Sequence, residues 1–257
     1  MSLQRIMAIA LNVVREIIRD NLMYFIVFYA IVMGIAAIIL PQVSLGSHTR
    51  ILLDFGLALT SWICVFVAVF LGSGLLNKEV ARRTILTLLP KPLSRTELLF
   101  GKLLGLLTVQ FIMIVSMTVL LLFILSIFRY GYNFISLLLA QFFLFLEVAI
   151  VGAFALLFGS FTGSILGAFL TFGIYLIGHL STDLFSLSLL SKNKSLLTIS
   201  HVFYLFFPDL ERLNLRNRVL YENHFNVVSL LSDFSYAVVY TFVLLTIGIF
   251  IFSRREF

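Results

Sequence analysis

One carboxylate, Glu147, lies inside a long apolar stretch that covers residues 134–180. An ionisable group inside a membrane is costly, and such residues often bind a substrate or carry protons. Glu147 is therefore a candidate substrate- or proton-handling residue. The alternative is structural: Glu147 makes a hydrogen bond to a neighbouring helix or to a partner copy. The sequence leaves both interpretations open.

Few other residues have the spacing that chemistry requires. His179 and Asp183 are four residues apart, but two ligands are too few for a metal, and an ion pair or helix cap is favoured. Cys64 is the only cysteine, which excludes an intrachain disulfide and a cysteine-based metal site. Gly101-Lys102 lacks the upstream glycine and the Ser or Thr of a P-loop. We expect no catalytic residue, metal or cofactor in this chain.

The composition is that of a multi-pass membrane protein. The 257 residues are 61% hydrophobic and only 12% charged, whereas soluble domains are about a quarter charged. The net charge of +6 is modest, so it indicates orientation and contact with lipid headgroups rather than nucleic-acid binding. We expect an all-α fold that forms a single transmembrane domain over residues 1–257.

Six segments are apolar enough to cross a bilayer. A proline, Pro41, is expected to end the first of them, and a turn at residues 159–164 separates the fourth from the fifth. The expected spans are residues 22–40, 51–76, 103–128, 134–158, 164–180 and 232–252.

Two further segments are expected to be helical without crossing. Residues 1–21 have apolar positions at helical spacing, which is typical of an amphipathic helix in the membrane interface. Residues 181–231 form the longest stretch without a span and are expected outside. Within them, residues 196–207 are apolar but too short to cross, which favours a re-entrant or interfacial helix that Pro208 ends.

Residues 77–102 form a basic loop between the second and third spans. They carry six of the 18 Lys and Arg residues of the chain. In the termini and short loops, Lys and Arg number 11 on the side of this loop and two on the other, which predicts that both termini and the loop are cytoplasmic.

The loop has a helix–break–helix pattern. Asn77 is expected to cap a helix that ends before Pro90 and Pro92, and Ser94 and Glu97 have the spacing of a capping box that starts the next helix. The residues expected to contact a soluble partner are Lys78, Glu79, Arg82, Arg83 and Thr84.

Residues 79–105, EVARRTILTLLPKPLSRTELLFGKLLG, resemble the first cytoplasmic loop of ABC type-2 permeases. The shared features are a glutamate that leads the coupling helix, the Thr-Ile and Leu-Leu pairs, a Pro-Leu-Ser-Arg turn and Gly-Lys before the third span. Arg83 replaces the glycine of many members. Pro208-Asp209-Leu210-Glu211 also resembles the stretch that often precedes the sixth span in this family.

The resemblance implies the membrane subunit of an ABC exporter. Two separate ATPase subunits would bind ATP and Mg²⁺ and contact residues 77–102, and a second copy or a related permease would complete the pathway. The membrane would be the cytoplasmic membrane of a bacterium or archaeon, and lipids and an outer-side accessory protein are further expected partners.

Two alternatives differ from export. The chain is either a permease that relays a mechanical signal to an outer-side partner through residues 181–231, or a secondary transporter or membrane-embedded enzyme centred on Glu147. Against the second stand the single buried carboxylate and the absence of polar clusters in other spans.

Overall fold

The computed structural model describes residues 3–43, 48–81, 94–191, 207–216, 218 and 226–254. These residues form helices without strands. Six of the helices are long and apolar enough to cross a membrane. The predicted all-α fold with six membrane spans is therefore confirmed.

The described helices follow one another along the chain. The long ones are α2 (Met23–Val43), α3 (His48–Ala81), α5 (Arg95–Ile127), α6 (Phe134–Phe161), α7 (Ser164–Ser191) and α10 (Val227–Ser253). Before them come α1 (Leu3–Ile17) and a π-helical turn, η1 (Ile18–Leu22); before α10 lies the short 3-10 helix η2 (Glu211–Leu213).

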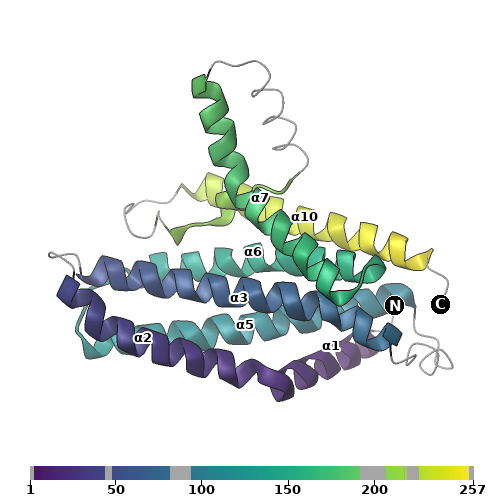
Figure 1. The fold of residues 1–257 in the computed structure, drawn as a ribbon, viewed down its shortest axis with the longest axis horizontal. Coiled ribbons are helices and arrows are strands. Elements are labelled where there is room, and N and C mark those ends of the chain that lie inside the picture. Colours follow the sequence, from purple (N-terminus) through teal and green to yellow (C-terminus); the bar gives the residue numbers. More distant parts are fainter. Residues whose placement is uncertain are drawn as a thin grey trace.

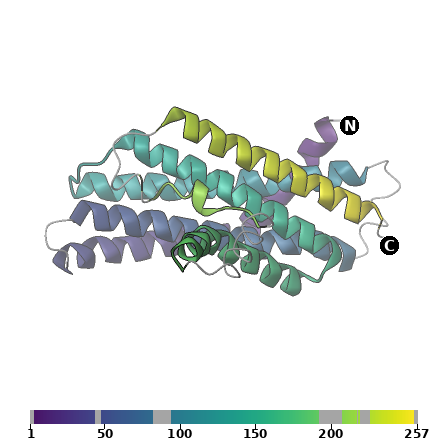
Figure 2. The same ribbon diagram turned by 90° about the horizontal axis from the view of Figure 1, so that it is seen from above.

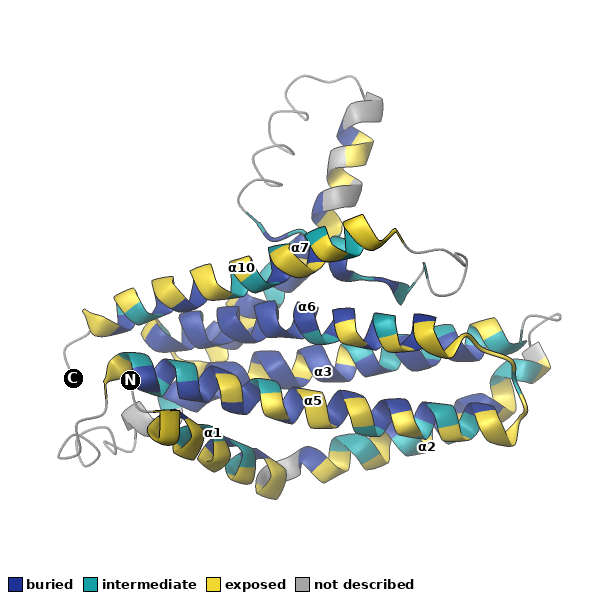
Figure 3. Cartoon of the chain, turned by 180° about the vertical axis from the view of Figure 1, so that it is seen from behind, coloured by how far each residue is buried: buried dark blue, intermediate teal, exposed yellow. Residues whose placement is uncertain are grey.

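Helix α6 is the centre of the bundle. Within its most apolar window, 67% of residues are buried, against 22% for α2 and for α10. It packs against α3, α5, α7 and α10, while α2 and α10 keep exposed apolar faces (Figure 3). In a membrane protein such faces meet lipid or partner helices, so their exposure is consistent with the span assignment.

Helix α7 does not stay with the bundle. Its first part lies along the other spans, and its last part projects away from them (Figures 1 and 2). The helix continues to Ser191, beyond its predicted end at Leu180. The sequence becomes richer in serine after residue 180, but this change does not end the helix.

Two predicted helix ends are wrong. Helix α2 continues through Pro41 to Val43, because a proline in the last turn removes only one backbone hydrogen bond. Helix α3 runs through Asn77 to Ala81 without a new start at Asn77. The Asn77 side chain instead donates to the Ser73 carbonyl, 3.0 Å away, within the same helix.

Helix α1 packs closely on the start of α5. A Cβ added at Gly101 would lie 2.8 Å from the Ile9 Cβ, and one at Gly105 would lie 2.7 Å from the Val13 Cβ. Two small residues four apart therefore let the helices touch, as in other membrane helix pairs. Leu3, Met7 and Leu11 remain exposed along α1. The predicted position of this helix in the membrane interface stays a prediction.

Candidate functional site

Residues 207–216 fold back into the bundle between α6, α7 and α10. The Leu210 amide donates to the Gly178 carbonyl of α7 over 3.2 Å, and Leu210, Leu213 and Leu215 are buried. The close approach requires glycine at position 178, because a Cβ there would lie 2.8 Å from the Pro208 carbonyl oxygen. We call residues 207–216 the inserted segment.

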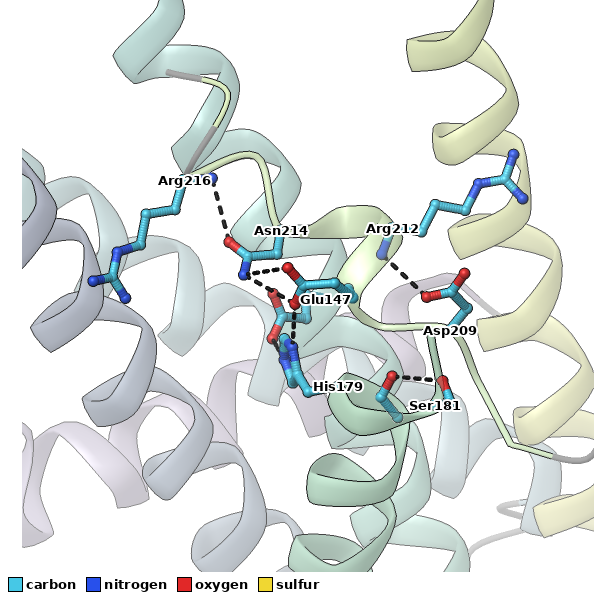
Figure 4. A network of polar contacts seen from close by, with 9 residues as sticks. Glu147, His179, Ser181, Asp209, Arg212, Asn214 and Arg216 are labelled. Atoms are coloured by element: carbon cyan, nitrogen blue, oxygen red, sulfur yellow. Dashed lines mark hydrogen bonds and ion pairs between the residues drawn. The ribbon is translucent and has the colours of Figure 1, made fainter. Parts of the chain in front are cut away.

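The inserted segment completes a chain of three ionisable side chains (Figure 4). Nε2 of His179 lies 2.9 Å from Oε1 of Glu147, and Nδ1 of the same ring lies 2.9 Å from Oε2 of Glu211. Glu147 is 3% exposed. Both hydrogen bonds together require two protons on the three groups, so the triad carries a net charge of −1 wherever those protons lie.

The geometry does not suit a metal. The two carboxylates bind opposite nitrogens of one ring, so their oxygens do not converge on one point. Among the described residues, no group of three His, Cys, Asp or Glu side chains could hold an ion. The predicted pairing of His179 with Asp183 lies outside what is described, since the Asp183 side chain is not described.

Asn214 supports Glu211 on its other side. Its Nδ2 donates to both carboxylate oxygens, at 3.3 and 3.2 Å (Figure 4). Burial raises the pKa of the Glu211 carboxyl, but the hydrogen bonds from His179 and Asn214 outweigh burial and lower that pKa below its usual value. Glu211 is therefore ionised at neutral pH and holds His179 by a charged hydrogen bond.

Two arginines fix the inserted segment to other helices. Arg216 donates to Asp54 of α3, with Nη2 at 2.8 Å from Oδ2. Arg212 donates to Asp233 and Ser232 of α10, and Asp233 is buried. The inserted segment thus contacts charged groups of α3, α7 and α10, and His179 links it to Glu147 of α6.

A cavity of about 280 Å³ lies beside the triad. Its lining includes Glu147, His179, Asn214 and Arg216 together with leucines of α3, α6 and α7. Gln141 also lines it, and neither Nε2 nor Oε1 of this side chain has a hydrogen-bond partner among the described residues. A buried amide without partners is costly, which marks the cavity as a candidate binding site.

The opposite end of the bundle holds the residues that flank the basic loop. Ser94 and Glu97 make the predicted capping box, which is present with both of its hydrogen bonds. Arg95 donates from Nη1 to the carbonyls of Phe252 and Ser253, over 2.9 and 2.6 Å, at the end of α10. The buried Lys102 donates to the Leu75 carbonyl of α3.

The residues predicted to contact a soluble partner are only partly described. Lys78 and Glu79 lie in the last turn of α3, where the backbone is described and their side chains are not. Arg82, Arg83 and Thr84 lie outside the described residues, as does the predicted re-entrant helix up to residue 206.

Residues 2–257 match a family described as ABC-2 family transporter protein. The chain belongs to the ABC-2 family. The match spans almost every residue, so it includes the six spans and the loop between α3 and α5. No curated protein matches this permease. Members of this family are the transmembrane component of a transporter, and they are not themselves catalytic.

Sequence reasoning about this permease found Glu147 and His179 but missed their connection. The expectation of a single buried carboxylate is wrong, because Asp233 and Glu97 are buried as well. The absence of polar clusters in the spans is also wrong. Asp54, near the start of α3, pairs with Arg216 of the inserted segment. The available signal was the density of charge at residues 209–216, directly before the sixth span.

Proposed function

We propose that this permease is the membrane subunit of an ABC exporter driven by two separate ATPase subunits that bind residues 77–102. The observation that carries the proposal is how the two flanks of that loop are attached. Lys102 connects the start of α5 to α3, and Arg95 connects it to the end of α10. A soluble partner that moves the loop would therefore move three spans together.

Helix α1 extends this attachment. It lies on Gly101 and Gly105 of the same part of α5, so a displacement of α5 would carry α1 with it. ATP-driven closure of two ATPases would then shift the spans between inward- and outward-facing states. ATP and Mg²⁺ would be bound by the ATPases, and residues of this chain would supply the contact and the coupling.

A second permease copy, or a related permease, would complete the pathway. The cavity beside the triad lies at the side of α3, α6 and α7, and the described parts of the six spans have packed interiors, so one copy offers little room for a central path. We propose that the protein lies in the cytoplasmic membrane of a bacterium or archaeon with both termini inside, because the loop and the termini carry most of the basic residues of the short loops and ends.

Affinity purification of the tagged permease from its native membranes tests the proposal. We expect an ATPase to co-purify, with a complex mass that fits two ATPases and two permease subunits and with ATP hydrolysis in the eluate. A fully active permease that purifies with one copy and without an ATPase would contradict it.

Cysteine labelling tests the orientation. Cys64 is the only cysteine and is buried, so single cysteines can be added to a Cys64→Ser background. Cysteines at Ser47 and Asn193 should react with an impermeant reagent from outside, and one at Ser94 only from inside. Reaction of Ser94→Cys from outside would contradict the proposed topology.

The Glu147–His179–Glu211 triad favours one second candidate, a proton-coupled transporter. Its three ionisable groups share two protons, which a secondary transporter could load and release. Transport that persists without ATP and follows an imposed pH gradient would support this candidate over the ATPase-driven one.

A further inference from the structure

The cavity beside the triad has unused hydrogen-bonding capacity on two side chains of α6. Gln141 is 4% exposed, and its amide offers both an acceptor and donors that no described residue uses. The only hydrogen bond of the Glu147 side chain is the one between Oε1 and His179, so Oε2 accepts none from the described residues. A ligand with N–H donors would satisfy both acceptors.

The charge around the cavity is negative. The triad carries −1, and Arg216 is balanced by Asp54 at 2.8 Å. A net negative charge in low-dielectric surroundings is stabilised by a cation and destabilised by an anion. Trp62 and Tyr175, which also line the cavity, meet edge to face with ring centroids 6.2 Å apart. Aromatic rings of this kind attract ammonium groups.

The rim of the cavity is apolar and faces outward from the bundle. Trp62, Leu176 and Leu180 line it and are 53%, 40% and 53% exposed. In a membrane-spanning protein such side chains meet lipid or a partner helix. A volume of about 280 Å³ is at the lower limit for a small-molecule site, so it fits a head group whose chain remains outside along the rim.

We propose that this cavity binds the ammonium head group of a single-chain cationic amphiphile that enters sideways from the lipid layer. Glu147 and Gln141 accept hydrogen bonds from the head group, Trp62 and Tyr175 contact its charge, and the chain lies against Leu176 and Leu180. This inference rests on the proposed function in one respect, which is the assignment of such an amphiphile as the exported cargo.

The single tryptophan of the chain makes binding measurable without transport. Purified permease in lipid nanodiscs, without ATPase, is titrated with twelve-carbon chains that carry bromine in the tail and an ammonium, hydroxyl or sulfate head group. Bromine quenches tryptophan emission on contact. We expect saturable quenching of Trp62, with half-saturation at least tenfold lower for the ammonium probe than for the other two.

Matched variants separate the site from partition into lipid. Gln141→Leu should raise the half-saturation concentration for the ammonium probe at least fivefold. Gln110→Leu alters the other buried glutamine of the described residues, which donates to the Cys64 carbonyl and does not line the cavity, and it should leave the half-saturation concentration unchanged. In Trp62→Phe/Phe123→Trp, the tryptophan moves to an exposed position of α5, where quenching should be linear and equal for the three probes.

Equal quenching curves for the three head groups, or an unchanged curve in Gln141→Leu, would overturn the proposal. So would tighter binding of the sulfate probe. Because no ATPase is present, failure here leaves the ATPase-driven mechanism standing, and failure of ATPase association leaves this binding result standing.

Discussion

The end of the bundle beside the basic loop and the region around the inserted segment are held together in different ways. At the end beside the basic loop, Lys102 and Arg95 donate to backbone carbonyls of α3 and α10, and a capping box starts α5. At the inserted segment, side chains pair with side chains: Arg216 with Asp54, Arg212 with Asp233, and His179 with two glutamates.

The difference matters for movement and for specificity. Backbone carbonyls are present whatever the sequence, so the attachments made by Lys102 and Arg95 do not depend on the identity of the partner side chain. Side-chain pairs depend on the identity of every member, and removing one leaves the other unsatisfied. We therefore expect substitutions at the inserted segment to affect stability more than substitutions beside the basic loop.

The largest effect is expected at Gly178. Gly178→Val would push against the Pro208 carbonyl and Leu210 and displace the inserted segment, at a cost of about 3 kcal/mol. Gly173→Val is the matched control on the same helix, because a Cβ there meets nothing within 4 Å. The free energy of unfolding in lipid, measured by steric trapping, checks both. Equal destabilisation would show that the segment does not depend on this contact.

Glu147 is expected to come next. Glu147→Leu leaves Nε2 of His179 without its acceptor and should cost about 2 kcal/mol. Glu147→Gln keeps a hydrogen-bonding group of the same shape, so we expect it to cost less than about 1 kcal/mol and to assemble normally. The same unfolding assay checks both variants. A cost for Glu147→Gln that equals the cost of Glu147→Leu would contradict the role of this hydrogen bond in stability.

A smaller effect is expected beside the loop. Ser94→Ala removes the cap of α5 and should cost about 1 kcal/mol. Ser229→Ala removes an exposed hydroxyl that bonds only to the Asn226 carbonyl and should change stability by less than about 0.5 kcal/mol. A Ser94→Ala cost that exceeds that of Glu147→Leu would reverse the proposed ranking of the two regions.

The same contrast explains what could be predicted from sequence. The capping box and the six spans depend on residues that are close together in the sequence, so spacing and apolar length are enough to predict them. The site is not, because Arg216 and Asp54 are 162 positions apart and His179 is 32 positions from each of its glutamates. Such pairs follow from how helices pack, which no local pattern contains.

Asn77 illustrates the limit on the local side. Asparagine is favoured as a helix cap and not inside a helix, yet Asn77 lies inside α3, where its side chain donates to the Ser73 carbonyl. The apolar length of α3 and the packing of Leu75 and Leu76 in the core decide between them. Tertiary packing therefore determines that α3 continues through Asn77, and the local sequence around Asn77 does not contain that information.

The smallest effect on stability and the largest on function are expected at Glu79. Glu79 precedes Arg82 and Arg83 by three and four residues, so Glu79→Arg places three like charges together in the part of the loop expected to contact the ATPase. Exposed pairs of this kind contribute only about 0.2–0.5 kcal/mol each, so the variant should insert and fold normally. Glu256→Arg is the matched control, with the same charge change near the C-terminus on the same expected side.

Co-purification of the ATPase with each variant, together with ATP hydrolysis by the complex, tests the central claim most directly. A desolvated contact across an interface costs about 2–5 kcal/mol when one partner is lost. We therefore expect Glu79→Arg to lose the ATPase or its stimulated hydrolysis, while Glu256→Arg keeps both. Wild-type association and hydrolysis in Glu79→Arg would contradict the claim that the basic loop couples this permease to its ATPases.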